Sequence, residues 1–195
     1  MQSDFEILSR IIKGRRTVKT AAMNGKKVPD EQIEQLLELA HWAPTHGRTE
    51  PWQFFVFSGE ALQGFGKDHG ALYTTHTDPE KQNPETPAKL SAATEKVSHL
   101  VVAAMKRGSN PKIPQVEEVA AASAAVQNVL LGAEALGLAA IWNTGGMSHN
   151  PAMKQMLGLG DEDIVLGLIY VGYTDEVKRE GKRHAAASEK ARWMR

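Results

Sequence analysis

Ala43-Pro44-Thr45-His46-Gly47-Arg48-Thr49-Glu50-Pro51-Trp52 is a polar loop between an amphipathic segment and an apolar run. Pro44 is expected to end a helix, because its ring disfavours helical geometry at the preceding residue. Pro51 stiffens the start of residues 52–57, which have the composition of a buried strand. Between the prolines lie hydroxyl, imidazole, guanidinium and carboxylate groups. A rigid loop that presents such groups is a common ligand site, but a plain surface connector fits the same residues equally well.

Helices and strands alternate irregularly around this loop. Ser3 and Glu6 form a capping-box pair, which predicts the start of a first helix. Pro29, followed by two acidic residues, predicts the start of a second helix. The other elements follow from apolar runs and helical spacing. The expected strands are residues 52–57, 99–105, 139–142 and 164–173, and the expected later helices are 59–65, 89–97, 116–136 and 151–157. This order predicts an α+β fold rather than a regular series of βαβ units.

The length of 195 residues suits a single domain over residues 1–195. Two segments stand apart from its predicted core. Residues 66–87 are polar and hold three prolines, so we expect a long mobile loop or lid there. Residues 174–195 are basic and polar, so we expect a basic C-terminal arm.

The composition argues against several classes of function. The formal net charge is zero, which argues against nucleic-acid binding through bulk electrostatics. The chain has no cysteine, so it has no disulfide, thiolate metal site or catalytic thiol. The first residues lack the pattern of a signal peptide. The apolar stretch 119–142 carries Gln127, Asn128 and Glu134, which favours a buried helix over a membrane span. We therefore expect a cytoplasmic protein without membrane or nucleic-acid partners.

The familiar catalytic motifs are missing from the sequence. It lacks a G-x-G-x-x-G after a strand, a P-loop and a G-x-S-x-G elbow. Its seven histidines do not have the spacing of a zinc-binding helix. A metal site is therefore not expected, and no side chain is assigned a catalytic role.

Three other polar segments are candidate binding sites. Arg15-Arg16-Thr17 follows a helix end and suits a phosphate, although a cationic helix C-terminus explains it more simply when it is taken alone. Trp142-Asn143-Thr144-Gly145 ends a short strand, where glycine either lets a ligand approach the backbone or makes an ordinary turn. Lys182 and Arg183 are either a phosphate clamp or part of a solvated charge run.

Taken in order, these segments resemble the nitroreductase family, and especially its short members. The resemblance covers nearly the whole chain, and its most specific parts are Arg15-Arg16-Thr17 and the A-P-T-H-x-x-x-E-P-W loop. It implies a central mixed, mainly antiparallel sheet flanked by helices, in a domain completed as a homodimer. It also implies FMN at the subunit interface and NAD(P)H as electron donor. The acceptor would be a nitro compound, a quinone or a similar small molecule, reduced in a ping-pong two-electron mechanism.

The resemblance assigns the phosphate end of the FMN to two groups of residues. Arg15, Arg16 and Thr17 would contact the phosphate and the ribityl chain. Arg183, together with Lys182, would help to hold the phosphate. Both groups supply the positive charge that a phosphate requires.

The resemblance assigns the ring end of the FMN to the other two segments. His46 and Glu50 would reach the flavin from the partner subunit, joined by Arg48. The stretch Trp142-Asn143-Thr144-Gly145 would pack along the isoalloxazine or the ribityl chain. The flavin would carry the redox chemistry, which explains why the sequence needs no catalytic triad, thiol or metal.

The sequence departs from the family pattern at two positions. Thr17 stands where serine is usual and keeps only the hydroxyl. Glu50 stands where glutamine is usual, and an ionised carboxylate only accepts hydrogen bonds, whereas an amide also donates them. A flavoenzyme of the same fold with a different reaction (dehalogenation, flavin fragmentation or azoline oxidation) and a non-catalytic FMN-binding protein remain alternatives.

Overall fold

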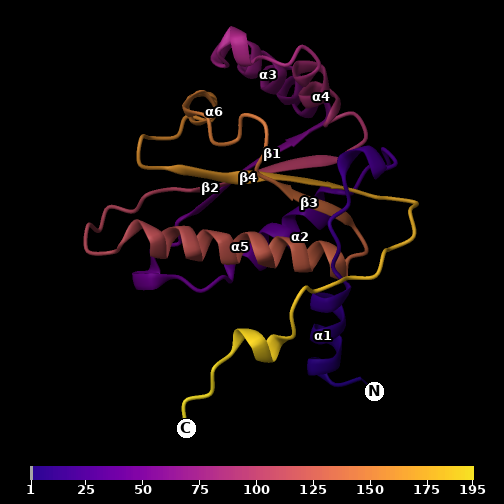
Figure 1. Cartoon of the computed structure of the whole chain (residues 1–195), viewed down its shortest axis with the longest axis vertical. Coiled ribbons are helices and arrows are strands. Elements are labelled where there is room, and N and C mark those ends of the chain that lie inside the picture. Colours follow the sequence, from indigo (N-terminus) through magenta and orange to yellow (C-terminus); the bar gives the residue numbers. More distant parts are fainter. Residues whose placement is uncertain (1) are drawn as a thin grey trace.

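One four-stranded antiparallel sheet forms the centre of the protein (Figure 1). The computed structural model describes residues 2–195. The strands lie in the order β1-β2-β4-β3. Their bounds are Trp52–Ser58 for β1, His99–Met105 for β2, Ala139–Asn143 for β3 and Ile164–Gly172 for β4. The predicted α+β class and the four predicted strands are therefore confirmed.

The two central strands, β2 and β4, are almost wholly buried, which explains their nearly continuous apolar sequences. Successive side chains of a strand point to opposite faces of the sheet. Along β2, Val101, Ala103 and Met105 join one core cluster, whereas Leu100 and Val102 join another. The protein therefore has two apolar cores, one on each side of the sheet.

A β-bulge interrupts the alternation in β4. The pairing with β2 slips by one residue between Ala103 and Ala104, so Leu166 has no partner residue in β2. A bulge leaves backbone groups unpaired, and here the Leu166 carbonyl accepts a 2.9 Å hydrogen bond from the indole N–H of Trp142. Gly167, with φ +144°, lies directly against that indole. The bulge and the Trp142 side chain therefore hold the end of β3 against β4.

Helices cover both faces of the sheet (Figure 1). On one face lie α2 (Asp30–His41) and α5 (Gln115–Ala135). On the other lie α3 (Gly59–His76), α4 (Thr86–Ala92) and α6 (Pro151–Met156). None of the helices within residues 2–195 is both long and apolar enough to cross a membrane.

The first helix, α1 (Asp4–Gly14), projects away from the two covered faces (Figure 1). Its start confirms the predicted capping box, because the Glu6 N–H donates to Ser3 Oγ and the Ser3 N–H donates to the Glu6 carboxylate. No residue of α1 is buried. Phe5, Leu8 and Ile12 lie on one stripe of the helix, as spacings of three and four residues require, and all three are exposed.

The predicted loop over residues 66–87 is wrong for its first half. Residues 59–76 form one long helix, α3, and α4 begins soon afterwards. Gly66 and Gly70, which favoured a loop in the sequence, lie where α4 packs closely on α3. A Cβ at Gly66 would lie 2.8 Å from the Ser91 carbonyl oxygen, and one at Gly70 would lie 2.7 Å from that of Pro87. These glycines serve helix packing rather than chain flexibility.

Residues 174–195 leave β4 as an extended, mostly exposed segment with one short 3₁₀ helix at Ala187–Lys190. The segment passes α1 and ends beyond it (Figure 1). This placement agrees with the predicted basic arm. The division of the chain into a single domain with such an arm stays a prediction.

Candidate functional site

The triplet Arg15-Arg16-Thr17 lies along the outer edge of β3. Thr17 forms a parallel bridge with Ala140, and the Val18 N–H donates a 3.1 Å hydrogen bond to the Ala140 carbonyl. The chain therefore extends the sheet by one short contact immediately after α1. This position places the triplet at the start of β3, with the end of that strand a few residues further along the same edge.

The Arg16 guanidinium already binds backbone carbonyls of the chain. Its Nη1 donates to Lys13 at 2.7 Å and to Arg15 at 2.8 Å, and its Nε donates to Arg179 at 2.9 Å. Gly181 packs so closely on the same guanidinium that a Cβ there would collide with it. Arg16 therefore joins the end of α1 to the C-terminal arm, a role that the sequence did not indicate.

A cavity of about 630 Å³ opens between the triplet and the arm. Its polar and charged lining residues are Arg16, Thr17, Lys19, Thr174, Glu176, Lys178 and Arg179. The volume falls in the range of small-molecule sites, which is roughly 300–1,000 Å³. Lys178 is paired with Glu134. The other three cations and two hydroxyls, against Glu176, still suit an anionic group such as a phosphate.

Lys182 and Arg183 lie on the exposed arm, beyond the arm residues that line the cavity. Neither lines it, and Arg183 Nη1 donates to the Lys182 carbonyl at 3.1 Å. The cations of the arm that the structure brings to the triplet are Lys178 and Arg179. The sequence did not indicate these two residues, because the positions of cations along an extended arm do not show which of them face the body of the protein.

The four residues Trp142-Asn143-Thr144-Gly145 divide between the core and the surface. The half-buried Trp142 side chain packs against the core, and its indole N–H donates to the Leu166 carbonyl. Asn143 Oδ1 accepts a 3.1 Å hydrogen bond from the Gly145 N–H, which shapes a turn. Thr144 and Gly145 are exposed. The fully exposed part of this segment is therefore the turn that follows β3.

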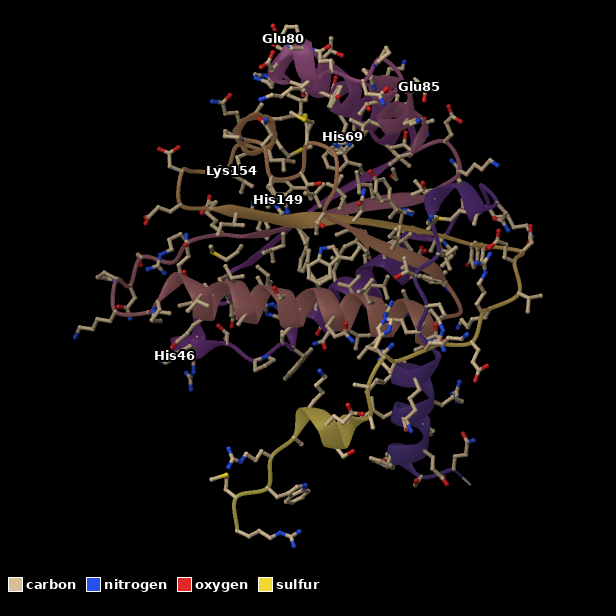
Figure 2. The ribbon with its side chains drawn as sticks, viewed as in Figure 1. His46, His69, Glu80, Glu85, His149 and Lys154 are labelled. Atoms are coloured by element: carbon tan, nitrogen blue, oxygen red, sulfur yellow. The ribbon has the colours of Figure 1, made fainter. Side chains whose placement is uncertain are left out.

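A buried histidine that the sequence did not single out holds the turn after β3. His69 in α3 is fully buried, and its Nε2 lies 3.0 Å from the Met147 amide nitrogen. Figure 2 shows it between α3 and the loop that leads to α6, close to His149 in the view. No sequence signal distinguished it, because it is one of seven histidines and lies in the stretch predicted to be a loop.

We expect His69 to make folding pH-dependent. Burial removes the imidazolium from water and lowers the pKa of His69 to about 4 from its ordinary 6.5. The unfolded chain takes up this proton first, so the stabilisation is complete above about pH 6.5 and is lost as the pH falls towards 4. The expected loss is about 3 kcal/mol. Urea unfolding at pH 7 and pH 4.5 measures it, and His69→Gln should remove that part of the pH dependence. An equal change of the unfolding free energy between the two pH values in the wild type and in His69→Gln would contradict this assignment.

The loop His46–Glu50 lies on the other side of the molecule and has a strained backbone. Gly47, Arg48 and Glu50 have positive φ angles of 60°, 56° and 44°. Left-handed backbone geometry is costly for residues other than glycine. Residues that adopt it nevertheless occur preferentially at functional sites. The Glu50 N–H donates to Thr45 Oγ1 at 3.1 Å, which helps to hold this geometry. The conformation singles out this loop as a candidate site, in agreement with its polar composition.

The polar side chains of this loop are paired in part. His46 Nδ1 pairs with Glu117 in the first turn of α5. Glu50 lies 4.0 Å from His41 Nε2, and His41 Nδ1 accepts from the Trp52 indole at 3.3 Å. Arg48 is exposed. Figure 2 shows His46 on the α5 side of the sheet, opposite His69.

The two halves of the candidate site do not meet within one chain. Glu50 precedes β1, whereas Thr17 and Asn143 lie along β3, and β1 and β3 are the opposite edges of the sheet. Two strands lie between them, so the edges are about 14 Å apart at roughly 4.8 Å per strand. The two groups of residues therefore lie on opposite edges of the sheet within one chain.

Three comparisons with known proteins agree with one another. The profile described as the Nitroreductase family matches residues 12–173. YdjA of Escherichia coli K12, provisionally named an NAD(P)H nitroreductase, is 27% identical over 144 residues, which cover 73% of this chain and 75% of YdjA. A solved nitroreductase-like family protein from Bacillus cereus superposes with a TM-score of 0.82 at 28% identity, covering 100% of this chain and 99% of that one.

A more distant solved structure shares the fold. It is the FMN-dependent nitroreductase NfnB from Mycobacterium smegmatis, determined in complex with NADPH. The two chains superpose with a TM-score of 0.72 at 20% identity, over 98% of this chain and 100% of NfnB.

Proposed function

This chain belongs to the nitroreductase family, and from that membership we propose that it is an FMN-dependent oxidoreductase. It uses NAD(P)H to reduce a nitro compound, a quinone or a similar small acceptor in two-electron steps. The name of YdjA and the description of NfnB, an FMN-dependent nitroreductase solved with NADPH, support this activity. The flavin, when bound, supplies the redox chemistry by accepting two electrons from the nicotinamide and passing them on.

The observation that carries the proposal is the cationic cavity beside the β3 edge. Its lining provides guanidinium, ammonium and hydroxyl groups that fit a phosphate. Thr144 lies four residues beyond Ala140, the bridge partner of Thr17, which is about 13 Å along the strand direction at roughly 3.3 Å per residue. An elongated cofactor with a phosphate at one end fits such an edge. Thr17 and Lys19 would bind its phosphate, and the exposed turn Asn143–Gly145 would bind its other end.

Lys19→Ala is expected to weaken FMN binding about tenfold and to leave riboflavin binding unchanged. Lys19 lines the cavity, and a charge-assisted contact to a phosphate contributes roughly 1.5–3 kcal/mol. Riboflavin lacks the phosphate, so its affinity should not depend on Lys19. Titration by flavin fluorescence measures both constants. Lys182→Ala is the matched control and should bind FMN like the wild type, because Lys182 lies outside the cavity. Equal losses in the two variants would argue against the cavity as the phosphate site.

We also propose that the functional unit is a homodimer in which His46, Arg48 and Glu50 of one chain complete the site of the other. The separation of the two groups on opposite sheet edges supports this arrangement. The exposed α1 supports it too. An isolated helix of 11 residues is marginal in water, and Phe5, Leu8 and Ile12 are 78%, 52% and 46% exposed. A second chain that covers this stripe would stabilise α1.

Leu8→Glu combined with Ile12→Glu is therefore expected to convert the protein to monomers at micromolar concentration. Charges in the centre of an apolar interface leave unpaired buried groups and oppose association. Light scattering after size-exclusion chromatography measures the mass. Met156→Glu, on α6 and 37% exposed, is the control and should keep the wild-type mass. A doubly substituted protein that remains dimeric would place the interface elsewhere.

The activity is tested first by the absorption spectrum of the purified protein and of its heat-released supernatant. Flavin bands and released FMN support the proposal. Stopped-flow mixing with NADH or NADPH should then bleach the flavin, and an added quinone or nitro compound should restore its colour. Bound FMN that neither nucleotide reduces would favour a non-catalytic FMN-binding protein. A colourless protein that takes up no added FMN would overturn the proposal.

A further inference from the structure

The imidazole of His69 must be neutral and must accept a hydrogen bond. Its Nε2 lies 3.0 Å from the Met147 amide nitrogen, and a backbone amide can only donate. The ring hydrogen is therefore on Nδ1. Within residues 2–195, Nδ1 has no hydrogen-bond partner, although the side chain is fully buried. An unpartnered buried donor costs free energy, so packing alone does not explain a histidine at this position.

The loop 143–150 is attached to the body by the buried side chain of Met147, which packs in a core cluster, and by one side-chain hydrogen bond from outside the loop, that of His69. The side-chain hydrogen bonds to its backbone otherwise come from the loop itself: Gly145 N–H to Asn143, and Ser148 Oγ to the Gly145 carbonyl at 2.7 Å. These bonds shape the loop but do not join it to the body. The bond from the Met147 N–H to His69 joins the backbone of the loop to α3.

The backbone of this loop also lies directly on the imidazole. A Cβ at Gly146 would lie 2.7 Å from His69 Nε2 and 2.8 Å from Leu90 Cδ2. Gly146 also has a φ of +67°, which disfavours other residues. The ring and the loop are thus in contact at Gly146, which directly follows the turn Asn143–Gly145.

We propose that His69 is the positioning residue of this turn: by accepting the Met147 N–H, it sets where the backbone of Asn143–Gly145 meets the bound flavin, and so controls the rate of flavin reduction. This inference rests on the proposed function, because it concerns the turn that would line the cofactor. His69 itself does not reach the surface and does not touch a reactant.

Two substitutions test the role of the hydrogen bond. His69→Gln keeps an acceptor oxygen at similar reach, whereas His69→Leu keeps apolar volume and removes the acceptor. Phe65→Leu is the control for packing, since Phe65 contacts the imidazole with ring centroids 5.8 Å apart and makes no hydrogen bond to the loop. Each variant is measured as the whole chain, without flavin for hydrogen exchange and with FMN bound for the reduction rate.

Two readouts separate positioning from folding. The first is hydrogen exchange at the Met147 amide, measured without flavin, which should accelerate at least about tenfold in His69→Leu and return in His69→Gln. The second is the stopped-flow rate of flavin reduction at saturating NAD(P)H. It should fall by about tenfold or more in His69→Leu, because a displacement of about 1 Å is enough for such a loss. The nucleotide dissociation constant should stay the same, and His69→Gln should recover most of the rate.

Several results would overturn the inference. One is a reduction rate in His69→Leu equal to that of the wild type. Another is an equal loss in His69→Leu, His69→Gln and Phe65→Leu, since that pattern reports packing alone. If the wild type binds no flavin, the proposed function fails and the control of flavin reduction fails with it. The Met147 exchange rates, which need no flavin, then decide the anchoring of the loop by themselves.

Discussion

Gly167→Ala is expected to lower the free energy of unfolding by about 4 kcal/mol. A Cβ at this position would lie 2.5 Å from Trp142 Nε1 and 2.8 Å from the Asn143 carbonyl oxygen. The backbone φ of +144° adds strain for any residue with a side chain. Strained backbone costs roughly 1–3 kcal/mol, and overpacking of a core costs roughly 1–3 kcal/mol more. The neighbours cannot simply move, because the Asn143 oxygen belongs to the backbone and the Trp142 indole is bonded to Leu166.

Gly158→Ala is the matched control for the backbone term. Gly158 has φ +67°, but no atom lies within 4 Å of the position that a Cβ would take there, so this variant should lose only about 1 kcal/mol. Urea unfolding of both variants, followed by far-UV circular dichroism, gives the difference. The double variant Gly167→Ala with Trp142→Phe should lose less than the sum of its parts, since the indole is one of the two obstacles. Equal stability of the two alanine variants would show that the strand and Trp142 yield without cost.

The strands were predictable because burial on both faces leaves a clear mark on the sequence. β2 was expected at residues 99–105 and occupies His99–Met105. Its side chains alternate between the two cores, so all but one of its residues are apolar. The exception, His99, has a hydrogen-bond partner within the protein, because its Nε2 lies 2.9 Å from an Asp30 carboxylate oxygen. β3 and β4 also appeared where they were expected, with one residue of difference at an end. A continuous apolar run bounded by polar turns indicates such strands well.

The segment 66–87 was not predictable by the same reasoning. Its glycines and prolines are loop signals in isolation, and only the partner helix shows their purpose. Gly66 and Gly70 let the backbone of α4 approach α3, and Phe65 and His69 of α3 are buried. A sequence pattern carries no information about which helix packs on which glycine. Glycine occurs both where helices pack closely and where the chain is flexible, so its presence does not distinguish the two.

The candidate site was predictable as a set of segments, but the roles of individual side chains were not. Arg16 and Thr17 of the triplet line the cavity, whereas Arg15 does not. However, Arg16 binds three backbone carbonyls, and Trp142 is half-buried against the core. Lys178 and Arg179 line the cavity, whereas Lys182 and Arg183 do not. These differences depend on the path of the arm and on the bulge in β4, which are long-range features. The assignment of all these residues to FMN stays a prediction.

The second large effect is expected at a buried ion pair below the strained loop. Glu118 in α5 is 1% exposed and pairs with Arg107, and its other oxygen accepts the Gly108 N–H at 3.0 Å. Arg107 also donates to the Ile113 carbonyl at 2.8 Å. Glu118→Ala removes the only carboxylate partner of the Arg107 guanidinium within residues 2–195. Breaking a buried pair on one side costs roughly 3–5 kcal/mol, because the remaining charge is buried without compensation.

The pair also links stability to the candidate site, because Ile113 supports the loop that carries His46 and Glu50. A Cβ at Gly47 would lie 2.8 Å from Ile113 Cδ1, so the two segments are in direct contact. Glu118→Ala should therefore raise hydrogen exchange in residues 46–50 as well as lower the unfolding midpoint in urea. The control is Glu85→Ala, which breaks the exposed pair with Lys89 and should cost less than about 0.5 kcal/mol. Glu118→Leu combined with Arg107→Met should be more stable than Glu118→Ala, because both charges leave the interior together. A double variant that is less stable than the single one would mean that the hydrogen bonds to Gly108 and Ile113, rather than the unpaired charge, dominate the loss.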